Sequence, residues 1–152
     1  MKKIFVAILF ITGSLFAMGQ TYSGQKNPTL QEKLNEEYCS ALFKNADGAI
    51  LEVSEDQSVQ GYLNILSWLD GRVAGLQVYS TWSGIKVPFI RGSHAKIYVD
   101  EIAVDDEYLN SLPVSDIAMI KVIKGPSASI FGANAVIAIY TLKGDDDEED
   151  IE

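Results

Sequence analysis

The sequence predicts an α/β (α+β) domain, built on a small mixed β-sheet of about four to five strands with flanking helices. A chain of 152 residues, 47% of them hydrophobic, is long enough for one domain with its own core. Stretches with the alternating polarity of strands are interleaved with stretches that have the three- and four-residue spacing of helices. Val136–Leu142 is apolar on both faces apart from Thr141, which predicts a central strand covered on both sides.

Two helices are predicted in the first half of the chain. The first runs from Leu30 to Phe43, and the Asn27-Pro28-Thr29 sequence before it leaves the capping residue open. Its apolar face comprises Leu30, Leu34, Tyr38, Ala41 and Leu42. Cys39 lies beside this face, which predicts a buried, inert thiol, with a reactive one as the alternative. A second helix is expected between Ser58, as its N-cap, and Asp70-Gly71, with an apolar face formed by Leu63, Ile65, Leu66, Trp68 and Leu69.

The remaining apolar stretches predict strands separated by glycine turns. Ile117–Lys124 alternates Ile120 and Val122 with Lys121 and Lys124, so we expect a strand with one solvated face. A helical turn is expected over Glu107–Leu112, ahead of Pro113. The other predicted strands are Ala49–Ser54, Leu76–Tyr79, Val87–Arg91 and Lys96–Asp100.

Composition and motifs exclude most catalytic and cofactor-binding classes. A net charge of −9 is unsuited to binding nucleic acid. With one cysteine and one histidine, the chain cannot form a disulfide framework or a multi-cysteine metal site. His94 lies in a polar turn, where a solvated imidazole is expected, and Asp105-Asp106-Glu107 lacks the spacing of a calcium loop. Gly125–Gly132 lacks the Gly-Lys-Ser/Thr ending of a phosphate loop. We therefore expect no enzyme, no metal and no cofactor.

The two ends of the chain predict an exported protein. Residues 1–19 have a Lys2-Lys3 start, a short apolar run and small residues before Gln20, as in a secretory signal peptide; a retained membrane anchor is the alternative. Residues 20–48 are expected to form a flexible leader and the first helix, and residues 49–144 the main domain. Residues 145–152 carry seven acids, which predicts a solvated, disordered tail or a handle for a basic partner. No later segment has 18 uninterrupted apolar residues, so direct membrane insertion of the mature chain is not expected.

Five short motifs in the same order resemble the plug domain of TonB-dependent outer-membrane receptors, especially their SusC-like branch in Bacteroidetes. Gly71-Arg72-Val73-Ala74-Gly75 is similar to the "G-R-V-A-G" segment of that family, and Ile90-Arg91-Gly92 to its "I-R-G" motif. Tyr98–Ile102 resembles the "V-D-G-V" turn, with Glu101 in place of the glycine. The last two matches are Asp116–Pro126, which resembles "D-I-x-x-I-x-V-x-K-G-P", and Ser129–Thr141, which resembles the end of the domain.

The resemblance implies a sheet-and-helix body whose polar surface fills the lumen of a β-barrel. It implies candidate plug contacts at Arg91, Asp100 and Lys124, with ordinary surface residues or internal salt links as the alternatives. Gly75, Gly92, Gly125 and Gly132 are expected to serve as backbone-turn residues.

The chain stops at Lys143-Gly144 and the acidic tail, where such receptors continue into a barrel. We therefore expect a stand-alone plug in the periplasm, associated with the outer membrane through a barrel partner, which gates that pore in trans. A large translocon such as that of the type 9 secretion system is a plausible host. Residues 20–49 contain no TonB-contacting box, so direct TonB contact is not expected. The alternatives are a periplasmic ligand-binding, signalling or adaptor module, a component of a TonB-dependent nutrient uptake complex, and a receptor remnant without a role.

Overall fold

The computed structural model of the protein describes residues 28–144. The predicted signal peptide, the leader up to residue 27 and the acidic tail at 145–152 lie outside the described residues. The elements, in chain order, are α2 (Leu30–Tyr38), β1 (Gly48–Glu52), η1 (Gln57–Gly61), α3 (Ile65–Leu69), β2 (Leu76–Ser80), β3 (Lys86–Ile90), β4 (Ser93–His94), β5 (Lys96–Val99), β6 (Ile102–Val104), α4 (Asp106–Ser111), η2 (Val114–Asp116), β7 (Ile117–Lys124), α5 (Pro126–Ser129) and β8 (Ala135–Thr141).

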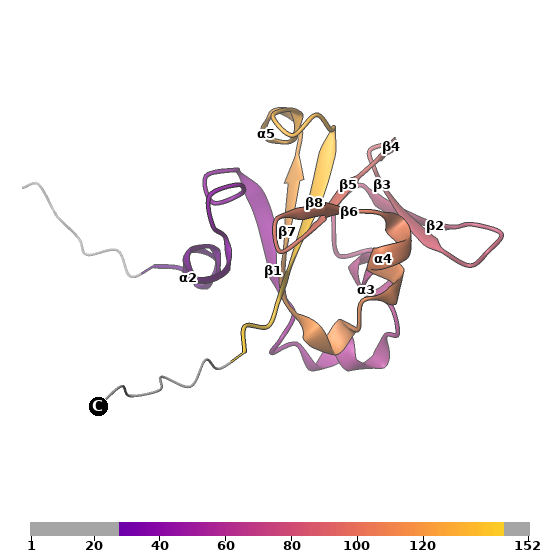
Figure 1. The fold of residues 1–152 in the computed structure, drawn as a ribbon, viewed down its shortest axis with the longest axis horizontal. Coiled ribbons are helices and arrows are strands. Elements are labelled where there is room, and N and C mark those ends of the chain that lie inside the picture. Colours follow the sequence, from indigo (N-terminus) through magenta and orange to yellow (C-terminus); the bar gives the residue numbers. More distant parts are fainter. Residues whose placement is uncertain (1–27, 145–152) are drawn as a thin grey trace, which may run out of the picture.

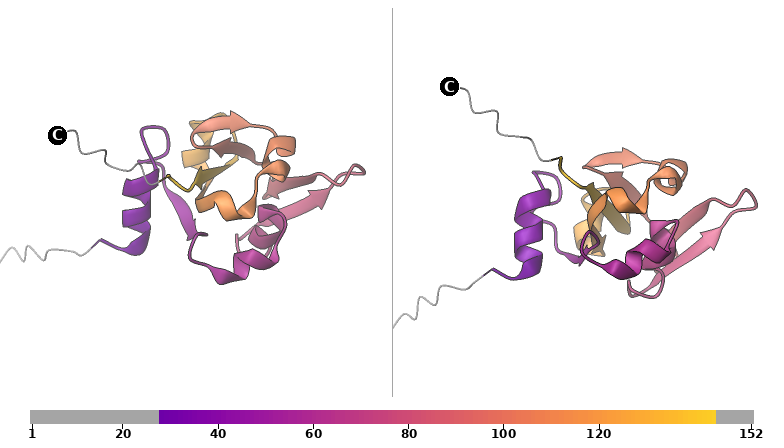
Figure 2. Two further views of the ribbon diagram at one scale, coloured as in Figure 1. Left: turned by 60° about the horizontal axis from the view of Figure 1, so that its bottom comes forward. Right: turned by 90° about the horizontal axis from the view of Figure 1, so that it is seen from below.

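Two sheets organise the described residues, which confirms the predicted mixed α+β class. The larger sheet has the order β1-β7-β8-β5-β6, with β5 parallel to β8 and the other pairs antiparallel. The smaller sheet, β2-β3-β4, was not predicted as a separate sheet. Figures 1 and 2 show helix α2 and the β2–β3 hairpin at opposite ends of the molecule. As predicted, β8 is the middle strand and is buried over six of its seven residues.

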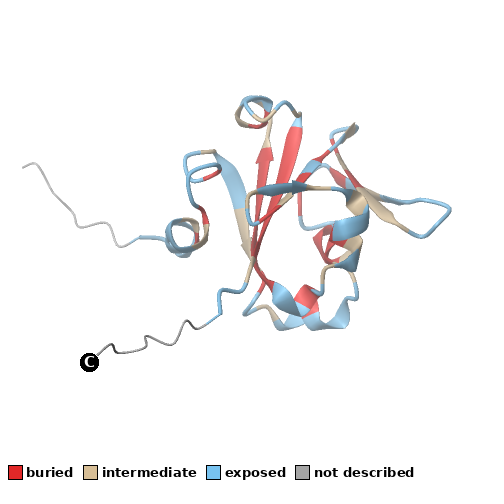
Figure 3. Ribbon diagram, in the orientation of Figure 1, coloured by how far each residue is buried: buried red, intermediate tan, exposed pale blue. Residues whose placement is uncertain are grey.

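The larger sheet separates two apolar clusters, one on each face. Side chains alternate along β8, so that Ile137 and Ile139 join one cluster while Val136, Ala138 and Tyr140 join the other. The first cluster includes residues of α3, α4 and the smaller sheet, and the second includes Leu34, Cys39 and Phe43. The buried colouring in Figure 3 accordingly concentrates on β7, β8 and α3.

The first helix is shorter than predicted. Thr29 caps α2 by accepting from the Glu32 amide, and the helix ends at Tyr38 instead of reaching Phe43. Leu34 is its one buried residue, whereas Leu30 and Leu42 of the predicted apolar face are 57% and 42% exposed. Cys39 is buried, as predicted. The chain after Cys39 leaves helical geometry and carries Phe43 into the core.

The second predicted helix is divided into η1 and α3. Asp56 caps η1 and Asn64 caps α3, so Ser58 is not the N-cap. Ser58 instead accepts a hydrogen bond from the Trp68 indole at 3.0 Å. Leu63 lies in the break between the two elements and is fully exposed, because the helical periodicity that would bury it is interrupted there.

The prediction of a solvated face on β7 is wrong. Seven of its eight residues are buried, and Lys121, which defined that face, is 2% exposed. Its face is covered by α2 and the segment that follows it, through Asn35 and Phe43, a tertiary contact that local alternation cannot reveal.

Candidate functional site

Arg91 and Lys124 lie at the same end of the molecule, although 33 positions separate them in the sequence. The Arg91 amide donates to the Gly75 carbonyl at 2.9 Å, and the Lys124 ammonium donates to the adjacent Ala74 carbonyl at 3.1 Å. At this end, Lys96 also donates to the carbonyl of Phe131, at 3.0 Å. We call Arg91, Lys96 and Lys124 the basic end. It concentrates positive charge on a chain that is acidic overall.

The four predicted glycines all have positive φ, between 68° and 80°. Gly75, Gly92 and Gly125 belong to the turns that meet at the basic end, and Gly132 follows α5 nearby. A hollow of about 250 Å³ lies between these turns and is lined by Ile90, Arg91, Ser93, Gly125, Ser129 and Asn134. The Asn134 amide donates to Ser93 at 2.9 Å, which fixes the β3–β4 turn against the loop before β8.

Arg91 has a left-handed backbone conformation and an exposed side chain. Its φ is 53°, and with Gly92 it forms the two-residue loop between β3 and β4, where both central residues have positive φ. The side chain is exposed, and its guanidinium has no ion pair or hydrogen bond with any residue in the range 28–144. A guanidinium in this state can bind a carboxylate of a partner through two parallel hydrogen bonds.

Asp100 lies at the opposite end of the larger sheet from the basic end. Its carboxylate accepts from the amide and the hydroxyl of Thr141, at 2.9 and 2.8 Å. These bonds join the end of β5 to the end of β8. Of the three predicted contacts, the structure therefore places Arg91 and Lys124 at the same end of the molecule. Asp100 instead forms hydrogen bonds within the domain, to Thr141.

Glu101 forms more hydrogen bonds than the other residue of this turn, Asp100. In the sequence it stands out only because it replaces the glycine of the "V-D-G-V" motif. With Asp100 it forms the two-residue loop between β5 and β6, at φ values of 67° and 46°. Its carboxylate accepts from the Ser40 amide and hydroxyl at 2.9 and 2.6 Å, from the Leu42 amide at 3.3 Å and from the Tyr140 hydroxyl at 3.2 Å. Partial burial raises the pKa of Glu101, but these hydrogen bonds outweigh it and the net pKa is lowered.

Glu101→Gln is expected to be less stable than the wild type by about 1–2 kcal/mol at pH 7, because charge-assisted hydrogen bonds become neutral ones. A lowered carboxyl pKa stabilises the fold above the unfolded-state pKa of about 4.3, and this stabilisation is lost as the pH falls through the folded-state pKa. The difference should therefore shrink below about pH 4.3. Urea titrations at pH 7, 5, 4 and 3 measure it. The neighbouring titratable groups Asp100, Cys39 and Tyr140 are the same in both proteins, so the difference in stability reports on residue 101. A difference that stays constant down to pH 3 would contradict the assignment.

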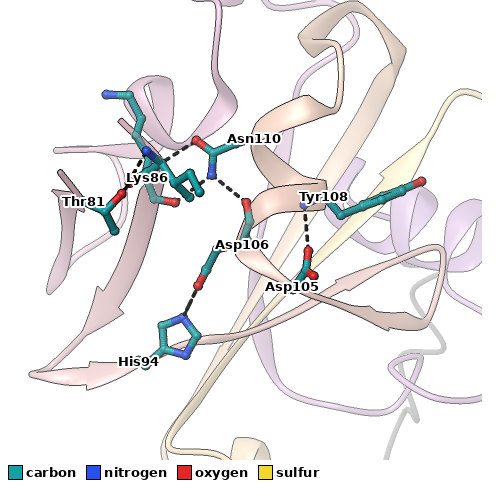
Figure 4. Close-up of polar contacts among 8 residues, drawn as sticks. Thr81, Lys86, His94, Asp105, Asp106, Tyr108 and Asn110 are labelled. Atoms are coloured by element: carbon teal, nitrogen blue, oxygen red, sulfur yellow. Dashed lines mark hydrogen bonds and ion pairs between the residues drawn. The ribbon is translucent and has the colours of Figure 1, made fainter. Parts of the chain in front are cut away.

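A third polar cluster attaches α4 to the smaller sheet (Figure 4). The Asn110 side chain accepts from the Lys86 amide at 2.9 Å and donates to the Lys86 carbonyl at 2.8 Å. His94, expected to be solvated, is half-exposed and lies 3.1 Å from Asp106. Asp105 caps α4 by accepting from the Tyr108 amide. Within residues 28–144 there is no group of three or more His, Cys, Asp or Glu side chains that could hold a metal ion.

The described residues have the architecture of a plug domain: a mixed central sheet, short helices and glycine turns that gather at one end. The TonB-dependent receptor plug domain family matches residues 44–139, and the chain belongs to this family. Plug domains of these receptors are components of transport systems. No curated protein matches the sequence.

The solved structures to which the chain is similar include a peptide importer and a ferric enterobactin receptor. The RagAB peptide importer in its open-open state is 28% identical with a TM-score of 0.53, and the match covers 65% of this chain and 12% of that chain. A ferric enterobactin receptor mutant, PfeA G324V from Pseudomonas aeruginosa, is 22% identical with a TM-score of 0.53. The match covers 67% of this chain and 18% of that chain, and it shows a likeness of fold alone. This chain thus spans less than a fifth of the length of either of these two solved chains. Among residues 28–144, no helix has the length and apolar character needed to cross a membrane.

Proposed function

We propose that this protein is a non-enzymatic plug that occludes or gates an outer-membrane β-barrel pore from the periplasmic side, with the barrel supplied by another polypeptide. The observation that carries the proposal is the exposed Arg91 at the basic end of a plug-family body, whose guanidinium has no ion pair or hydrogen bond among residues 28–144. Barrel lumens are polar and offer hydrogen-bond partners to such a body. A carboxylate on the lumen wall would complete the coordination of the Arg91 guanidinium.

The packing of the described residues supports action in trans. Both apolar clusters are closed by residues between Leu34 and Tyr140, without a contribution from a barrel. No buried side-chain nitrogen or oxygen atom of the described residues lacks a hydrogen-bond partner. A body with this core can fold before it meets the lumen. A large secretion translocon, such as that of the type 9 system, is a host that such a plug would keep closed between substrates.

Purification of the chain with a C-terminal tag from outer membranes is expected to recover a β-barrel protein in stoichiometric amount. Deletion of the gene should raise outer-membrane permeability to large antibiotics or dyes severalfold, because an unfilled lumen of this class is a water-filled channel. Complementation with the wild-type gene is the matched control. Recovery only as a free periplasmic monomer, together with unchanged permeability, would contradict the proposal. A barrel found on the same polypeptide would contradict action in trans.

A cavity favours a second candidate function, that of a periplasmic ligand-binding module. The cavity has a volume of about 480 Å³, within the range of small-molecule sites, and lies between η1 and η2. It is lined by Val53, Ser54, Asp56, Val59, Gln60, Tyr62, Leu63, Pro113, Val114, Ser115 and Ile117. Since RagAB is a peptide importer, short peptides are the first ligands to test. This function predicts that peptides raise the melting temperature of the isolated chain and that no barrel is recovered with it.

A further inference from the structure

Residues 30–47, which we call the strap, cover one face of the larger sheet. The strap comprises α2 and the chain that leads into β1. Leu34, Cys39 and Phe43 are its buried side chains. The Phe43 ring packs against Tyr98 and Phe131, with ring centroids 5.0 and 4.7 Å away. Most of the strap precedes residue 44, where the plug-family match begins.

The sheet face beneath the strap carries a cation that is poorly suited to burial. The Lys121 ammonium donates to the Asn35 side-chain oxygen at 2.6 Å and to the Phe43 carbonyl at 2.7 Å, and both acceptors are neutral. Burial lowers the pKa of Lys121, so the closed strap disfavours its charged form. Opening the strap would return the ammonium to water. Lys121 therefore favours the open arrangement, while burial of Phe43 favours the closed one.

Glu101 also binds the strap, at residues that come just before Phe43 in the sequence. Its carboxylate accepts from two strap amides, those of Ser40 and Leu42, and from the Ser40 hydroxyl. To do so, Glu101 occupies a left-handed backbone conformation that a glycine would adopt without strain. Strain at a position that is held by specific contacts is a mark of switch regions.

The strap packs incompletely on both sides. A groove of about 310 Å³ separates α2 from β1 and the chain before it, and it is lined in part by Glu32, Asn35, Lys44 and Asp47. A second hollow, of about 260 Å³, lies beside Glu101 and is lined in part by Tyr38, Ser40 and Tyr140. The hydrogen bonds between Glu101 and the strap lie at the surface, and solvent-accessible hydrogen bonds are typical of segments that open locally.

We infer that the strap opens and closes on the sheet as a local two-state element, and that the Glu101 carboxylate holds it closed. The inference goes beyond the proposed plug function and does not depend on a barrel. Opening exposes Cys39, which is 3% exposed in the closed arrangement and is the one cysteine of the sequence. The thiol therefore reports directly on the position of the strap.

The test is the labelling rate of Cys39 by a maleimide in the full mature chain, measured over a range of urea concentrations below the unfolding transition. Local opening exposes little surface, so the wild-type rate should depend little on urea; global unfolding would give the steep dependence of the whole domain. Glu101→Gln should raise this urea-independent rate about tenfold, because the charge-assisted bonds to the strap are lost. Ser40→Ala, which removes one of these bonds, should raise it by a smaller factor.

Two controls separate strap opening from general destabilisation. Leu109→Ala removes a fully buried side chain from the other apolar cluster, and should move the unfolding transition while leaving the urea-independent rate unchanged. Glu55→Gln neutralises an exposed carboxylate in the turn after β1 and should change neither quantity. The inference is overturned if wild-type labelling follows the urea dependence of global unfolding, or if Leu109→Ala accelerates labelling as much as Glu101→Gln does.

Discussion

Trp68→Ala is expected to lower the free energy of unfolding by about 3–5 kcal/mol, the cost of leaving an aromatic-sized cavity in a packed core. Trp68 is 2% exposed and lies in α3, on the face of the larger sheet opposite the strap. Its indole donates to the Ser58 hydroxyl at 3.0 Å, and the Arg72 guanidinium lies 4.7 Å from its ring centroid. Truncation therefore removes apolar packing, a hydrogen bond and a cation–π contact together.

The second tryptophan of the chain provides the matched control. Trp82 is fully exposed beyond the end of β2, in the loop of the β2–β3 hairpin, so Trp82→Ala should change the unfolding free energy by less than about 0.5 kcal/mol. Urea titrations followed by far-ultraviolet circular dichroism measure both variants without relying on tryptophan emission. Equal losses in the two variants would show that α3 does not occupy the core position described here.

Local pattern predicted six of the eight strands of the described residues and missed the short strands β4 and β6, and it could not predict what covers the strands. The apolar run of β8 was sufficient to place it at the centre of the sheet, because a strand without a polar face must be covered twice. The same reasoning failed at β7, where Lys121 is buried by Asn35 and Phe43, residues about 80 positions earlier in the chain. The alternation of polar and apolar residues shows which face of a strand is polar. Whether that face is buried depends on which distant segment of the chain covers it, as residues 35–43 cover Lys121.

The candidate contacts were identified residue by residue, but their grouping depended on topology. Asp100 and Lys124 each come at the C-terminal end of a strand, β5 and β7. Because β5 runs parallel to β8 while β7 runs antiparallel to it, the C-terminal ends of β5 and β7 lie at opposite ends of the sheet along the strand direction. Strand direction follows from pairing between strands that are distant in the chain, which local sequence patterns do not reveal. The departure from glycine at Glu101 was the one available signal for the attachment of the strap.

Arg91→Glu is expected to abolish recovery of the plug with its barrel, if the proposed occlusion of a barrel lumen holds. Removing one partner of a desolvated charge pair commonly costs about 2–5 kcal/mol of binding, roughly thirtyfold or more in affinity, and charge reversal adds repulsion. The measurement is the amount of barrel that co-purifies with the tagged chain from outer membranes. Lys124→Ala should have a smaller effect, because its ammonium is already bonded to the Ala74 carbonyl.

Arg91→Asn separates the charge from the fold. Asparagine tolerates the left-handed conformation that Arg91 occupies, so this variant should fold normally and still lose about thirtyfold or more in recovery. Arg91→Lys keeps the charge but not the two parallel hydrogen bonds of a guanidinium, so it should lose less than Arg91→Asn. Lys33→Asn removes an exposed positive charge from α2, which is not part of the basic end, and should leave recovery unchanged. Loss of recovery in both asparagine variants would indicate dependence on net charge alone. Undiminished recovery of Arg91→Asn and Arg91→Glu would exclude Arg91 as the contact with the barrel, since both variants lack the guanidinium that the proposal places against a carboxylate of the lumen wall.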